Sequence, residues 1–177
     1  MADKSPTDGL ILFWDMFTVR SGKIDDLAST GNDGTITGTA DKAGQVGRAR
    51  AFDGINDRVV ADSAPAVGAS FTICGWVKVR NGAAANGTLW AGEDGENHRI
   101  FWNATSSKWS ADMKSGATTS LLESGATDAS GAFKHIAYRY NGHTRYLFVN
   151  GVTRASAAIT GTFTWSQVQV GGIGAAT

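Results

Sequence analysis

The chain has 177 residues, of which 16 are basic and 16 acidic, so its formal net charge is zero. A balanced charge without a basic run excludes the electrostatic attraction by which proteins bind nucleic acids and anionic membranes. The length is enough for one domain with a buried core, and 23 glycines against 2 prolines favour many turns between unbroken strands.

The N-terminal residues 1–9 are polar and lack the apolar stretch of a secretion signal. No later segment approaches the ~20 apolar residues of a membrane span. We expect a flexible tail over residues 1–8 and a single domain over residues 9–177. A chain without a signal fits a protein released by cell lysis, such as a phage virion component, and also a secreted protein expressed without its signal. The expected location is therefore the virion or the extracellular space.

Short apolar or alternating runs bounded by turn residues predict strands throughout the domain, and no helical period is present. The first strand is expected at residues 9–17, followed by a loop-rich segment at residues 25–38. Further strands are expected at residues 71–79, 88–91, 99–103, 108–114, 119–124 and 163–170. Many short strands at such spacing indicate a sandwich or a barrel.

The segment 133–151 predicts a β-meander with its turns. Two alternating runs, 136–140 and 145–149, flank Asn141-Gly142, and Asn150-Gly151 follows the second run. Asn-Gly accepts the positive φ that tight turns between twisted antiparallel strands require.

Five segments together follow one family pattern. Their matching residues are Gly9, Trp14 and Phe17; Asp26, Asn32 and Gly34; Gly44, Val46, Gly47, Ala49, Phe52, Asp53, Gly54, Asp57 and Val59; Phe71, Thr72, Ile73, Trp76, Val77 and Lys78; and Phe133, His135, Ala137, Tyr140, Asn141, Gly142, Phe148, Val149, Asn150 and Gly151. In these residues the chain resembles the laminin-G-like domains of the concanavalin A-like jelly-roll group. The resemblance implies an all-β fold, an antiparallel two-sheet jelly-roll sandwich. Expected core residues are Trp14, Phe71, Ile73, Trp76, Ile136, Tyr138, Phe148, Val149 and Trp165.

The resemblance also implies an open sheet edge. The family usually closes with an extra acidic strand that pairs near the first strand, whereas residues 170–177 here are glycine-rich and uncharged. The apolar segment 10–17 would then be an unpaired edge, which invites another strand. We expect either that the natural chain continues beyond Thr177 or that a neighbouring chain in an assembly covers this edge.

Catalytic residues are not evident in the sequence. The glutamates are Glu93, Glu96 and Glu123, and the first two lie in a glycine-containing turn rather than on one sheet face, as retaining glycosidase chemistry needs. His98, His135 and His143 have no metal-binding spacing. The lone Cys74 is predicted to be a small buried hydrophobic residue. We therefore expect a protein that is not an enzyme.

Two binding sites are candidates. Calcium prefers oxygen ligands on loops, and Asp33, Asp53 and Asp57 are its candidate ligands, although these side chains could instead cap their own turns. No other cofactor is expected. A glycan-binding face is the second candidate, because aromatic stacking and polar side chains hold sugars; the alternative is that its aromatic residues belong to the core. Its candidate residues are Trp90, Asn97, Arg99, Trp102, Asn103 and Trp109.

Together these features predict a non-catalytic binding or structural module. We expect a phage virion surface component, either a capsid decoration or a tail or fibre protein, that contacts glycans or neighbouring virion proteins. The alternative is a secreted glycan-binding module or an accessory domain of a carbohydrate-active enzyme.

Overall fold

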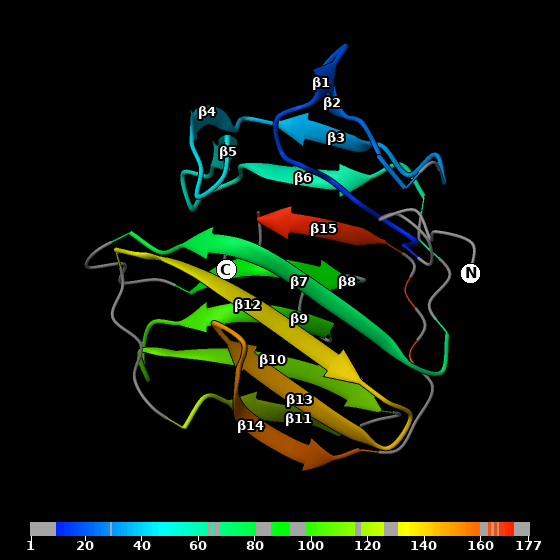
Figure 1. The fold of residues 1–177 in the computed structure, drawn as a ribbon, viewed down its shortest axis with the longest axis vertical. Helices are drawn as coiled ribbons and strands as arrows, with labels where there is room; N and C mark the ends of the chain where they lie inside the picture. The colour runs from blue at the N-terminus through cyan, green and yellow to red at the C-terminus, as the bar shows by residue number, and fades with distance from the viewer. Residues whose placement is uncertain are drawn as a thin grey trace, which may run out of the picture.

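The computed structural model describes residues 10–28, 30–63, 65, 68–80, 86–92, 98–115, 118–125, 131–159, 163, 165 and 167–171. Within these residues all regular structure is β-strand, arranged as two stacked antiparallel sheets and a small hairpin (Figure 1). The all-β sandwich expected from the sequence is confirmed. In the described part of the chain there is no helix long and apolar enough to cross a membrane.

The larger sheet has nine strands. In spatial order they are β1 (Val19–Arg20), β2 (Lys23–Ile24), β3 (Gly34–Thr37), β6 (Arg58–Ala61), β15 (Val168–Gly171), β8 (Gly87–Gly92), β9 (His98–Asn103), β10 (Lys108–Ser115) and β11 (Thr118–Glu123). The strand β15, near the end of the chain, pairs with β6 on one side and β8 on the other. It therefore joins strands that are far apart in the sequence.

The smaller sheet has four strands, in the order β14 (Val152–Ala158), β13 (Thr144–Val149), β12 (Phe133–Tyr140) and β7 (Phe71–Lys78). It lies in front of β8 to β11 in Figure 1. A separate hairpin is formed by β4 (Ala40–Ala43) and β5 (Arg48–Ala51).

The predicted meander is confirmed as β12, β13 and β14. Asn141 bridges the first turn, since its Oδ1 accepts hydrogen bonds from the amides of His143 at 3.1 Å and Thr144 at 2.8 Å. In the second turn Asn150 and Gly151 have φ of 51° and 77°. Positive φ at both central residues is what a type I′ hairpin turn requires.

The core lies between the two sheets. The smaller sheet contributes the buried residues Ile136, Tyr138, Tyr140, Leu147 and Val149, and the larger sheet contributes Trp90, Ile100, Trp102, Trp109, Ala111, Met113, Leu122 and Val168. Of the expected core residues, Ile136, Tyr138 and Val149 are buried, whereas Phe71, Ile73, Trp14 and Trp165 pack against the core and are partly exposed.

Three residues expected inside the core lie on the outer face of the smaller sheet. Trp76 is 51% exposed, and Cys74 is exposed. Phe148 pairs with Ala137, which in turn pairs with Cys74, so its ring lies on the same outer face. The predictions for these residues were wrong because the smaller sheet is covered on one face only, and successive side chains of a strand point to opposite faces.

A buried arginine joins the two sheets. Arg145 of β13 is 2% exposed, and its guanidinium donates hydrogen bonds of 2.6 Å to both the carbonyl oxygen and the Oγ of Ser120 in β11. Burial lowers the pKa of Arg145. These charge-assisted bonds fix the end of the larger sheet to the smaller one.

The expected first strand is not a strand. Residues 10–17 run irregularly, and the first strand of the described chain is β1. The ring of Trp14 lies against Gly34, where an added Cβ would be only 3.0 Å away, and its Nε1 donates to the carbonyl oxygen of Asn32 at 2.9 Å. The amide of Phe13 donates to the Asp26 carboxylate rather than to a strand partner. The prediction of an edge strand at residues 10–17 was therefore wrong.

Candidate functional site

One register row of side chains crosses the larger sheet on the face turned away from the smaller sheet. Directly paired residues of antiparallel strands lie on the same face, so the row can be followed from pair to pair. It contains Lys23, Thr35, Val60, Gln169, Ala91, Arg99, Asp112 and Leu121. We call this face of the larger sheet the polar face, because five of these eight side chains are polar or charged.

A hollow of about 460 Å³ opens on the polar face over β3, β6 and β15. It is lined by Thr35, Thr37, Arg58, Val60, Gln167 and Gln169. Five of these six side chains are hydrogen-bonding groups: two hydroxyls, two carboxamides and one guanidinium. The hollow can therefore both donate and accept hydrogen bonds within a small area.

The charges at one border of the hollow are already paired. Asp62 accepts hydrogen bonds from the Nζ of Lys23 at 2.6 Å and the Oγ1 of Thr35 at 2.9 Å. These bonds lower the pKa of Asp62, and the bond to Asp62 raises the pKa of Lys23. Within the described residues Arg58 has no carboxylate partner in an ion pair. Its guanidinium is therefore the cation of the hollow that a ligand can use.

Farther along the polar face, two carboxylates hold a hydrogen-bonded network. The Nε and Nη2 of Arg99 lie 2.9 and 2.8 Å from one oxygen of Asp112, and the guanidinium stacks 4.2 Å from the ring centre of Phe101. Glu123 accepts hydrogen bonds from Asn103 at 3.0 Å, Ser106 at 2.8 Å and Ser110 at 3.1 Å. Both carboxylates are engaged by protein donors, which orient the polar side chains beside them.

The structure divides the predicted glycan face between two sides of the sheet. Arg99 and Asn103 lie on the polar face. Trp90, Trp102 and Trp109 lie on the opposite face, in the core, and are only 5%, 4% and 2% exposed. Their rings offer no surface on which a sugar could stack, so this part of the prediction was wrong. Asn97 lies outside the described residues.

The alternation within β9 could have revealed this division. His98, Ile100 and Trp102 share one face of the strand, and the residues between them share the other. Arg58, Gln167 and Gln169 were missed as site residues. The alternating Gln-Val-Gln-Val sequence at residues 167–170 was the available signal, because it places both glutamines on one face.

The candidate calcium ligands do not form one site. Asp33 precedes β3 and Asp57 precedes β6, which places them at opposite ends of this strand pair. The Oδ1 of Asp53 accepts the amides of Ile55 at 2.8 Å and Asn56 at 3.3 Å, and these backbone bonds lower its pKa. Asp53 therefore caps its own turn, which was the alternative left open by the sequence. No cluster of three His, Cys, Asp or Glu residues suited to a metal occurs in the described part of the chain.

Of the glutamates considered for catalysis, Glu93 and Glu96 lie outside the described residues, and Glu123 lies on the polar face. Asp112 and Glu123 lie on the adjacent strands β10 and β11 of the polar face, and both are bound by the donors named above.

Two stacked antiparallel sheets with a core between them define the chain as a β-sandwich protein. The profile of the concanavalin A-like lectin/glucanases superfamily matches residues 52–176, and the chain belongs to this family. No curated protein matches the sequence.

Three solved structures show the same fold. Trypanosoma rangeli sialidase, in complex with 2,3-difluoro-KDN, aligns with a TM-score of 0.67 at 15% identity, over 97% of this chain and 28% of the sialidase. The carbohydrate-binding module CBM66 of Bacillus subtilis aligns with a TM-score of 0.51 at 14% identity, over 78% of this chain and 91% of the module. Domain 4 of the Geobacillus stearothermophilus arabinanase AbnA, in complex with arabinotriose, aligns with a TM-score of 0.51 at 16% identity, over 83% of this chain and 85% of that domain.

Proposed function

We propose that this protein is a non-catalytic glycan-binding module and that the hollow of the polar face holds the glycan. The observation that carries the proposal is the lining of this hollow by Arg58, Gln167, Gln169 and two threonines. Sugar hydroxyls both donate and accept hydrogen bonds. Carboxamides and hydroxyls match them in both directions, and the guanidinium adds a fork of donors.

The compared proteins support the same class. Two of the three structures of similar fold are a carbohydrate-binding module and an arabinanase domain solved with an oligosaccharide. They support glycan binding as a class of function and do not identify the sugar.

The hydrogen bonds that protein groups already make to the carboxylates of the polar face favour a module without catalysis. A glycosidase needs one carboxyl group as acid and another as base or nucleophile, both directed at the substrate. Asp112 is bound by Arg99, and Glu123 accepts three hydrogen bonds from protein groups. The opposing hypothesis, a glycan-active enzyme, predicts release of reducing ends that is lost in Asp112→Asn or Glu123→Gln.

Binding by the hollow can be tested with two substitutions. Glycan ligands of the wild-type chain are first found on an array of neutral and acidic oligosaccharides, and the affinities are then measured by calorimetry. We expect Arg58→Ala and Gln169→Ala each to weaken binding at least tenfold, because each removes hydrogen bonds to the bound sugar. The control is Arg48→Ala on the hairpin β4–β5, where Arg48 pairs with Asp41. Unchanged affinities in both hollow variants would contradict the proposed site.

A role in a virion, or in another assembly, stays a prediction from the sequence. One observation of the structure favours contact with a neighbouring chain. Leu10, Ile11, Phe13 and Phe17 are 41%, 40%, 41% and 48% exposed, so the N-terminal segment presents apolar surface to solvent. Apolar surface of this kind is typical of contact sites. We expect concentration-dependent association in sedimentation velocity that the double variant Phe13→Ser, Phe17→Ser abolishes. A monomer at all concentrations would contradict the expectation.

A further inference from the structure

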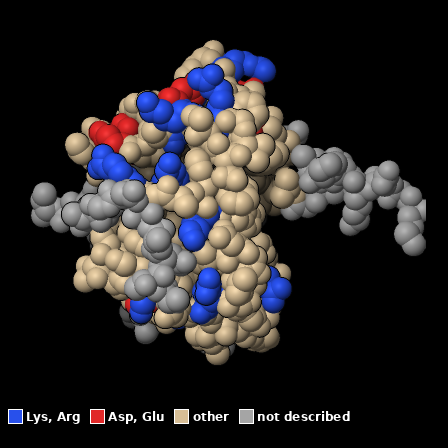
Figure 2. All heavy atoms as spheres, turned by 60° about the vertical axis from the view of Figure 1, so that its left-hand side comes forward, with Lys and Arg blue, Asp and Glu red and all other residues tan. Residues whose placement is uncertain are grey.

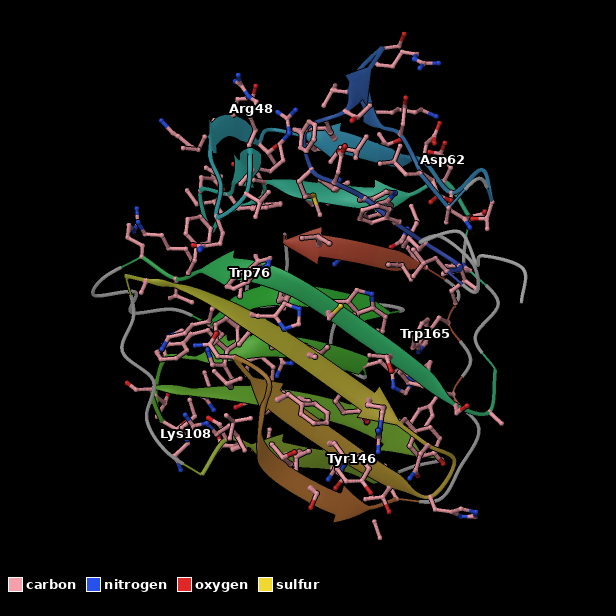
Figure 3. All side chains as sticks on the ribbon, viewed as in Figure 1. Arg48, Asp62, Trp76, Lys108, Tyr146 and Trp165 are labelled. Atoms are coloured by element: carbon pink, nitrogen blue, oxygen red, sulfur yellow. The ribbon has the colours of Figure 1, made fainter. Side chains whose placement is uncertain are left out.

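The outer face of the smaller sheet carries aromatic rings where an outer face is usually polar. In register, Trp76 lies opposite His135, Lys78 opposite Phe133, and Arg139 opposite Tyr146. Phe148 follows two residues after Tyr146 and shares its face. Figure 3 shows Trp76 on β7 and Tyr146 on β13, on the sheet that lies in front. We call the outward-facing side chains of β7, β12, β13 and β14 the aromatic face.

The rings of the aromatic face form two contacts and leave surface uncovered. Trp76 and His135 meet edge to face with centres 5.4 Å apart, whereas Tyr146 and Phe148 stack at 6.2 Å with an angle of 28° between their planes. Despite its contact with His135, Trp76 remains 51% exposed. Together with the neighbouring rings, the half-exposed Trp76 forms an apolar patch of the kind that binding sites present.

The charges of this sheet all have one sign. The strands β7, β12, β13 and β14 contain no Asp or Glu, and their basic residues are Lys78, Lys134, Arg139, Arg145 and Arg154. Most acidic side chains visible in Figure 2 lie instead in the upper part of the molecule, beside basic ones. Arg145 is buried between the sheets and Lys134 lies opposite Val77 on the inner side, so Lys78 and Arg139 are cations that the register places on the aromatic face.

Two of these cations lie directly over the rings. The Nζ of Lys78 is 5.7 Å from the ring centre of Phe133, and the guanidinium of Arg139 is 4.6 Å from that of Tyr146. Neither cation has an ion-pair partner within the described residues. A cation over an aromatic ring keeps its hydrogen-bond donors at the edge free for an anion.

A second hollow adjoins Arg139 at the end of β7 and β12. Its volume is about 490 Å³, and it is lined by Ser70, Phe71, Thr72, Arg139, Tyr140 and Asn141. The hydroxyls and the carboxamide add neutral hydrogen-bonding groups beside the guanidinium. The aromatic face thus continues into a shallow hollow of mixed polar and apolar lining that contains a cation.

We propose that the aromatic face and this second hollow bind an acidic polysaccharide, a chain of sugar rings that carries carboxylate or sulfate groups. The apolar sides of sugar rings pack on Trp76 and Phe148. An acidic group pairs with the guanidinium of Arg139, whose fork of donors matches a carboxylate or sulfate. The site is distinct from the hollow of the polar face, and the two lie on opposite sides of the sandwich. The inference rests on the proposed function only for the class of ligand.

The arrangement favours a glycan over an acidic protein. Interfaces between proteins are depleted in lysine, whereas arginine and aromatic residues are enriched there. On the aromatic face the ammonium of Lys78 lies over the ring of Phe133, among the other aromatic side chains. Alternating apolar and anionic contacts along one surface fit a repeating acidic saccharide.

The test is affinity electrophoresis of the full chain through gels containing polygalacturonate, its fully methyl-esterified form, or heparin. The ester retains the sugar chain and removes the charge, and heparin replaces carboxylate largely with sulfate. We expect retardation by at least one acidic polymer, weakened at least tenfold by Trp76→Ala and by Arg139→Gln. Retardation by the ester should be much weaker. Both residues are exposed, and thermal melting verifies that the variants are folded.

The control variant is Arg48→Gln, which removes an exposed cation far from the aromatic face and should bind like the wild type. No retardation by either acidic polymer at low salt overturns the inference, and so does retardation unaffected by both variants. If Arg58→Ala abolished retardation by the acidic polymers and Arg139→Gln left it unchanged, the proposed function would stand, but the second site would be contradicted. Equal retardation by polygalacturonate and its ester would also contradict an acidic ligand.

Discussion

At the scale of single residues, Asp26 ties the N-terminal segment to the turn that precedes β3. Its buried carboxylate accepts hydrogen bonds from the amides of Phe13 at 3.0 Å, Ala28 at 3.0 Å and Asn32 at 3.2 Å, and from the Oγ1 of Thr30 at 2.5 Å. Burial alone would raise the pKa of Asp26, but these hydrogen bonds outweigh it, and the pKa lies below the ordinary 3.8. The carboxylate therefore stabilises the fold in its ionised form.

The substitution Asp26→Asn tests this role. The Asn side chain has one acceptor oxygen and a donor group that would face the amide of Asn32, so we expect a loss of about 2 kcal/mol at pH 7. Because the folded-state pKa is lowered, the stabilisation is present above about pH 3.8 and is lost as the pH falls through the folded-state value. In urea unfolding, the difference from the wild type should shrink in strong acid.

The matched control is Asp41→Asn on β4, where the carboxylate is exposed and pairs with Arg48. It should change the free energy of unfolding by less than about 1 kcal/mol. A deficit of Asp26→Asn that is equal at pH 7 and in strong acid would contradict the role of the ionised carboxylate.

At the scale of strands, local signals were readable in the sequence and long-range ones were not. The turn at Asn150-Gly151 depends on two adjacent residues, and the meander was predicted correctly. The apolar run 10–17 predicts a strand, but an apolar run does not reveal whether its backbone pairs with a strand or with side chains. The hollow of the polar face requires the pairing of β15 with β6, which no local pattern indicates.

The end of β15 provides a test of that pairing. Gly171 has φ of 75°, and an added Cβ would lie 2.3 Å from Phe52 and 2.8 Å from the carbonyl oxygen of Asp57. Gly151 has nearly the same φ, 77°, with no atom within 4 Å of an added Cβ. Alanine costs roughly 1–2 kcal/mol of backbone strain at either position. At Gly171 steric overlap should add about 1–3 kcal/mol.

We therefore expect Gly171→Ala to lower the melting temperature clearly more than Gly151→Ala does. The comparison separates backbone strain from steric overlap, because only the second differs between the two sites. Equal melting temperatures for the two variants would show that Gly171 does not lie against Phe52 and the residue before β6 as described.

At the scale of the whole molecule, a chain without net charge presents two unlike faces. The polar face of the larger sheet carries paired charges and a hollow rich in amides and hydroxyls, whereas the outer face of the smaller sheet is aromatic and its strands contain no Asp or Glu. Composition alone cannot show this division, since it sums over both faces. The period of two along each strand separates them, and strand order then brings the separated side chains together.

The most direct test of glycan binding by the polar face is an NMR titration with an oligosaccharide identified on the array. Side-chain amide signals of Gln167 and Gln169 report on the hollow, because both carboxamides line it. We predict that these signals shift in a saturable way, while the sugar signals show no new reducing ends during the titration. Unshifted glutamine signals at saturation, or a growing signal from cleaved sugar, would contradict a non-catalytic glycan site at this hollow.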